Sequence, residues 1–87
     1  MFDFISKEDL DKEIYRLCDL FNKGLIIETL AQTDKLLQTF PRSAALHVIA
    51  GDANTKLKRY ETGIKNYKIA LEIKPDFAVT HFNLGNA

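Results

Sequence analysis

Histidine, cysteine and carboxylate side chains are the groups in this chain that could bind a metal ion or attack a substrate. The chain has two histidines, His47 and His81, and one cysteine, Cys18. No cysteine or carboxylate cluster accompanies either histidine to complete a metal site. A catalytic cysteine needs a positive neighbourhood that lowers its pKa, whereas Cys18 is followed by Asp19. We therefore expect no catalytic residue, no metal site and no cofactor, and we expect both histidines to be half-buried packing residues.

The overall composition argues against two further classes of function. Twelve Lys and Arg residues balance twelve Asp and Glu residues over 87 positions, so the formal net charge is zero. Proteins that bind nucleic acid carry an excess of cations for the phosphates, so no nucleic-acid partner is expected. No apolar run approaches the roughly 20 residues that cross a bilayer. A single cysteine permits no intrachain disulfide, which favours a reducing compartment. We therefore expect a cytoplasmic protein with no membrane partner.

Apolar residues recur at the spacing of an α-helix along the whole chain. The first stripe is Leu10, Ile14, Leu17, Cys18 and Phe21, and three more run over residues 26–40, 46–57 and 60–71. Ser6 stands where an N-cap is expected, Gly24 is placed as a C-terminal glycine, and Pro41 and Pro75 end the second and fourth stripes. A fifth helix is expected after Asp76. The short spacers predict antiparallel neighbouring helices.

The sequence also repeats with a fixed period, which is the spacing from Pro41 to Pro75. The same spacing separates the members of the pairs Leu37/Leu71, Ala44/Ala78, His47/His81, Gly51/Gly85 and Ala53/Ala87. A fixed period with two helices in each unit is typical of a stacked helical repeat. Equivalent residues of successive units lie about one repeat apart, too far for the two histidines to share a zinc ion with bonds of about 2.0–2.1 Å.

These features resemble the tetratricopeptide repeat family, whose unit has about 34 residues in two antiparallel helices, A and B. Residues 44–77 follow the family pattern at Gly51, Ala53, Leu57, Tyr60, Tyr67, Ala70 and Pro75. Helices that pack about 8–10 Å apart need small residues at their crossing. We expect Gly51 and Ala70 to supply them, Gly63 to permit close approach, and Tyr60 and Tyr67 to fill the space beside them.

The resemblance implies a division of the chain into units. Residues 1–9 hold an N-terminal extension and the start of the first helix, residues 10–43 form a divergent first unit, residues 44–77 form a second unit, and residues 78–87 begin a third. The first unit departs from the family pattern at Leu17, Thr29 and Thr33. The expected fold is an all-α, right-handed solenoid of about two and a half units and five helices.

The resemblance further implies a concave groove lined by the A helices, where a peptide or a helix of a partner protein would bind. The residues expected in this groove are Ile14, Cys18, Phe21, Val48, Asp52, Thr55, Lys56, Val79 and Phe82. Some relatives hold the C-terminal carboxylate of chaperone tails with a clamp of Lys, Asn and Arg side chains. The clamp positions here carry Ile14, Cys18, Ile49, Val79 and Asn83. The cations are missing, so we expect no chaperone-tail clamp.

Two other functions remain open. The end of the chain is apolar and uncharged, so Phe77, Phe82 and Leu84 could pair two copies into a homodimer. The same apolar face could instead belong to the N-terminal part of a larger bacterial protein of transferase type. A non-catalytic protein–protein interaction module is the leading hypothesis.

Overall fold

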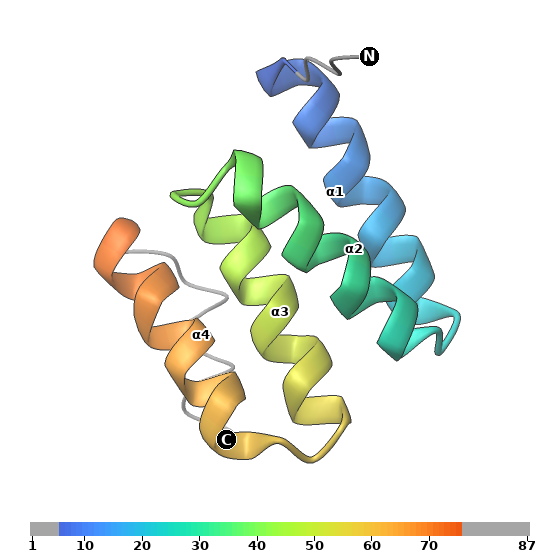
Figure 1. Ribbon diagram of the computed structural model, residues 1–87, viewed down its shortest axis with the longest axis vertical. Helices are drawn as coiled ribbons and strands as arrows, with labels where there is room; N and C mark the ends of the chain where they lie inside the picture. The colour runs from blue at the N-terminus through green and yellow to red at the C-terminus, as the bar shows by residue number, and fades with distance from the viewer. Residues whose placement is uncertain (1–5, 76–87) are drawn as a thin grey trace.

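The computed structural model describes residues 6–75, which form four α-helices in two antiparallel hairpins (Figure 1). The helices are α1 (Lys7–Asn22), α2 (Ile26–Thr39), α3 (Ala44–Lys56) and α4 (Tyr60–Ile73). The described residues contain no β-strand, and none of their helices is long and apolar enough to span a membrane. The all-helical prediction is therefore confirmed for this part of the chain. The expected fifth helix lies outside the described residues.

The helices recur with the period of the sequence. Helix α4 begins and ends one repeat period after α2 begins and ends, and α3 ends one repeat period after α1 ends. Helix α1 begins at Lys7, inside the segment expected to hold the start of the first helix. In α1 the Ser6 hydroxyl accepts a hydrogen bond from Asp9 N at 3.2 Å, as the N-cap prediction requires.

The turns that end α1 and α3 share one geometry. Gly24 has a φ of 84° and Lys58, its equivalent in the next unit, has a φ of 65°. In the first turn Gly24 N donates to Phe21 O and Leu25 N donates to Leu20 O, and in the second Lys58 N donates to Thr55 O and Arg59 N donates to Asn54 O. Both helices thus close with a left-handed residue that satisfies their last carbonyls. Glycine adopts this conformation freely, but lysine does not.

Replacing Lys58 with glycine should therefore stabilise the protein, by about 1 kcal/mol, because the left-handed conformation costs other residues roughly that much. Urea denaturation of the variant and the natural protein measures the difference. The matched control is Lys56→Gly inside the last turn of α3, which should destabilise by about 1 kcal/mol. If Lys58→Gly also destabilised the protein, the side chain of Lys58 would contribute more than its backbone strain costs.

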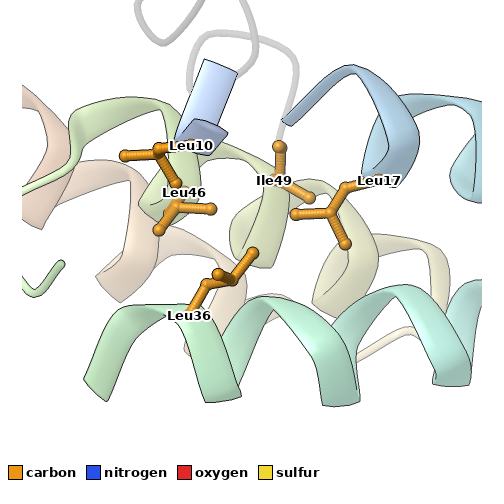
Figure 2. Close-up of a cluster of buried hydrophobic side chains, with 5 residues drawn as sticks. All are labelled: Leu10, Leu17, Leu36, Leu46 and Ile49. Atoms are coloured by element: carbon orange, nitrogen blue, oxygen red, sulfur yellow. The ribbon is translucent and has the colours of Figure 1, made fainter. Parts of the chain in front are cut away.

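Helix α3 occupies the centre of the fold and contacts the other three helices. Its Leu46 and Ile49 form one apolar cluster with Leu10 and Leu17 of α1 and Leu36 of α2 (Figure 2). A second cluster joins α3 to α4 through Ala44, Val48, Tyr67 and Ala70. Because α3 is covered on several sides, eight of its thirteen residues are buried.

Two glycines allow α3 and α4 to cross closely. A Cβ atom on Gly51 would lie 2.6 Å from Cδ1 of Tyr67, and one on Gly63 would lie 3.1 Å from the Gly51 carbonyl oxygen. The expected roles of Gly51, Gly63 and Tyr67 are therefore confirmed. The expectation for Tyr60 is wrong, because its side chain is 51% exposed at the first position of α4. It lies at the helix end, beyond the crossing that Tyr67 fills.

The first hairpin reverses the sizes of the residues at the equivalent positions. Leu17 takes the place of Gly51, and Thr33 takes the place of Tyr67; both are fully buried. A large residue on the first helix is thus combined with a smaller one on the second. Thr29 and Thr33 are buried with their hydroxyls donating to Leu25 O at 2.6 Å and Thr29 O at 2.7 Å. Both hydroxyl groups therefore have a hydrogen-bond partner, so burying these two threonines leaves neither hydroxyl unpaired.

Candidate functional site

A cleft of about 580 Å³ lies between the N-terminal parts of α1 and α3. Helix α1 and the start of α3 contribute Lys7, Leu10, Asp11, Ile14, Ala44 and Ala45, and the loop before α3 and the end of α4 contribute Phe40, Pro41, Arg42, Ser43, Ile73 and Lys74. The cleft therefore forms where two parallel helix starts, a loop and a helix end meet.

The walls of this cleft combine apolar and cationic side chains. We call Leu10, Ile14, Phe40 and Ile73 the apolar floor, and Lys7 and Arg42 the basic rim. Ile14, Phe40 and Ile73 are half-buried, so each still has surface that a ligand can cover. Asp11 is the one acidic residue among the described residues that line the cleft. A cleft of this kind suits an apolar side chain with negative charge beside it.

The loop that forms one wall is held by two side chains. Leu46 N donates to the hydroxyl of Ser43 at 3.3 Å, which caps α3. Nε2 of His47 donates to the carbonyl of Pro41 at 2.8 Å. His47 is half-buried, as expected, and its ring positions the loop. No group of three or more His, Cys, Asp or Glu residues capable of holding a metal occurs within residues 6–75.

The residues expected in the groove lie in different environments in the structure. Ile14 lines the cleft, whereas Val48 is 6% exposed and packs inside the second cluster. Half-buried positions hold Phe21, Asp52 and Thr55, and exposed positions hold Cys18 and Lys56. Val79 and Phe82, together with the self-association residues Phe77 and Leu84, lie outside the described residues.

Several cleft residues were missing from the expected groove. Phe40, Arg42, Ile73 and Lys74 come from the loop and the end of α4, whereas the expectation considered only the faces of the A helices. Phe40 stands directly before Pro41, whereas Ile73 stands two residues before Pro75, so the two residues are not equivalent in the repeat. An apolar residue within two positions of each proline was the available signal for this part of the site.

Polar side chains tie α3 to α4 beyond the cleft. Tyr67 donates its hydroxyl to Oδ1 of Asp52 at 2.6 Å, and Nδ2 of Asn54 donates to Oδ1 of Asn66 at 2.9 Å. Burial raises the pKa of Asp52, and the hydrogen bond from Tyr67 opposes that rise. Burial and the bond to Asp52 together raise the pKa of the Tyr67 phenol. This pair fixes the Tyr67 ring at the crossing of the two helices.

The charge of Asp52 reaches across to α1. The pKa of the Cys18 thiol is raised, first by partial burial and second by the nearby Asp52 carboxylate. A raised pKa disfavours the thiolate, which is the reactive form of cysteine. The environment of Cys18 is thus the opposite of one that activates a nucleophile.

The pH dependence of stability should reveal the half-buried carboxylate of Asp52. Burial raises the pKa of Asp52 in the folded protein above its value in the unfolded chain. The contribution of Asp52 to the free energy of unfolding is therefore present at acid pH and is lost as the pH rises through the folded pKa. Asp52→Asn keeps an oxygen that accepts from Tyr67 and removes the charge. The advantage of this variant over the natural protein should therefore be larger at pH ~7 than at pH ~4 in urea denaturation.

The control for this experiment is Asp19→Asn, because the Asp19 carboxylate is 62% exposed. Its difference from the natural protein should change little between the two pH values. An Asp52→Asn advantage that stayed constant with pH would contradict the assigned effect of burial.

Comparison with known proteins adds one finding. Residues 51–87 match the family model described as TPR repeat. Neither a curated protein nor a solved structure matches the chain significantly. The match begins at Gly51, the small residue at the crossing of α3 and α4. Residues 51–87 are therefore similar to a TPR repeat, and the helices within residues 6–75 recur with the period expected of such repeats.

Proposed function

We propose that this chain is a non-catalytic protein–protein interaction module that binds a peptide or a helix of its partner along the face shared by α1 and α3. The cleft between these two helices is the observation that carries the proposal. The match of residues 51–87 to a TPR repeat supports it, because repeats of this type generally bind protein partners.

The exposed chemistry of the face suits a peptide ligand. Ile14 offers apolar surface at the cleft, and the small Ala45 leaves room above the first turn of α3. An extended or helical peptide gains affinity from such a groove by burying apolar anchors and fixes its register with polar contacts.

The test selects ligands from a random peptide library on the full chain and measures their affinity by isothermal titration calorimetry. Ala45→Glu places a charged chain in the cleft, and acidic residues are tolerated in the first turn of a helix. We expect this variant to fold normally and to lose affinity by at least about tenfold, which corresponds to roughly 1.4 kcal/mol.

The matched control is Ala31→Glu, which makes the same change at an exposed position of α2 outside the cleft. This variant should bind the selected peptides as the natural protein does. If no peptide is selected, or if both variants lose affinity equally, the cleft is not the binding site and the proposal fails.

A further inference from the structure

We infer that the cleft between α1 and α3 takes a segment of a partner protein in which carboxylates flank large apolar side chains. This inference rests on the proposed function, because it names the chemistry of the ligand for the same cleft. Two observations carry it: the apolar floor and the excess of positive charge around it.

The apolar floor supplies the affinity. Ile14, Phe40 and Ile73 come from three different elements and converge on one cleft while remaining only half-buried. Burying a Leu or Phe side chain is favourable because it removes a large apolar surface from water. A single large apolar anchor of the ligand, placed on this floor, therefore accounts for most of the attraction.

The basic rim determines which charge on the ligand is favoured. Lys7 and Arg42 are exposed, and neither forms an ion pair with any residue within 6–75. These two cations stand against one carboxylate, Asp11, among the described residues that line the cleft. The two acidic residues in the first turn of α1, Glu8 and Asp9, do not line the cleft. Electrostatic complementarity of this kind governs specificity more than total affinity.

The experiment uses two fluorescein-labelled peptides with identical spacing of leucine and phenylalanine. One carries glutamate at every other position, and the other carries lysine. Fluorescence anisotropy with the full chain at low salt should show the glutamate peptide binding about fivefold to tenfold tighter, since each exposed charge pair contributes only weakly. The preference should shrink as salt is added, because exposed charges are screened.

Reversal of the rim charge tests the assignment to this cleft. In the double variant Lys7→Glu and Arg42→Glu, the lysine peptide should become the tighter ligand. The control is the double variant Lys35→Glu and Lys65→Glu, which changes the net charge equally at exposed positions outside the cleft. It should keep the preference for the glutamate peptide. Circular dichroism confirms that both double variants are folded.

The possible outcomes separate this inference from the proposed function. Equal binding of the two peptides, or an equal response of both double variants, overturns the acidic ligand while leaving a peptide-binding cleft in place. Failure of library selection, tested independently, overturns the cleft as a binding site altogether.

One competing occupant is a segment of the chain itself. Residues 1–5 read Met-Phe-Asp-Phe-Ile and directly precede Ser6 and Lys7, so they combine apolar side chains with a carboxylate. A variant that lacks residues 2–5 is compared with the full chain in the same anisotropy assay. Equal affinity for the glutamate peptide supports a partner protein as the ligand. Binding seen only after the deletion overturns that assignment and identifies the N-terminal segment as the occupant.

Discussion

Replacing Gly51 with alanine should lower the free energy of unfolding by about 1–3 kcal/mol, although alanine is the better helix former. The added Cβ would lie 2.6 Å from Cδ1 of Tyr67, and carbon atoms that are not bonded do not approach so closely. The ring cannot swing away easily, because it is 2% exposed and its hydroxyl is bonded to Asp52. The two helices must therefore separate, and urea denaturation measures the loss.

The sign of this effect should reverse when the ring is removed. In a Tyr67→Thr background the position has the residue found at Thr33 in the first hairpin. There Gly51→Ala meets no ring and should stabilise by about 1 kcal/mol through helix propensity alone. Tyr67→Leu gives a second, milder background if the threonine variant does not fold. If Gly51→Ala cost the same with and without the ring, the contact with Tyr67 would not be its cause.

The fold was predictable where the residue sizes follow the pattern of the family. The repeat period correctly located the helices, and the small Gly51 correctly marked the crossing filled by Tyr67. The first hairpin was harder to interpret, because Leu17 and Thr33 reverse the sizes of the residues at these two places. When each position is compared separately with the family pattern, both Leu17 and Thr33 count as mismatches. Packing depends on the summed volume of facing residues, which the reversal largely preserves.

The candidate site was predictable only in part, for two physical reasons. Val48 was expected in the groove, but α3 is surrounded by three helices and so buries residues on more than one face. An apolar residue on such a helix can face a ligand or a neighbouring helix, and periodicity does not distinguish the two. Phe40 and Ile73 were missed because the cleft depends on where a loop and a helix end meet. That meeting is decided by tertiary packing.

The central position of α3 leads to the largest expected loss of stability from a single truncation. Leu46 is fully buried between Leu10 of α1 and Leu36 of α2 in the first cluster (Figure 2). Leu46→Ala should therefore destabilise by about 2–5 kcal/mol, because it removes apolar contacts and leaves a cavity. Small domains hold roughly 0.05–0.15 kcal/mol of stability per residue, so this loss is a large fraction of the total.

The matched control is Leu25→Ala, which removes the same atoms from a side chain that is 45% exposed and should cost less than about 1 kcal/mol. Urea denaturation of both variants, monitored by circular dichroism, compares their free energies of unfolding. Leu46 joins the two hairpins, because it lies on α3 of the second hairpin and packs in one cluster with residues of α1 and α2 in the first hairpin. Its truncation should therefore unfold both hairpins in one transition. Two separate transitions, or a cost no larger than that of Leu25→Ala, would show that each hairpin is held by its own contacts and that the shared cluster contributes little.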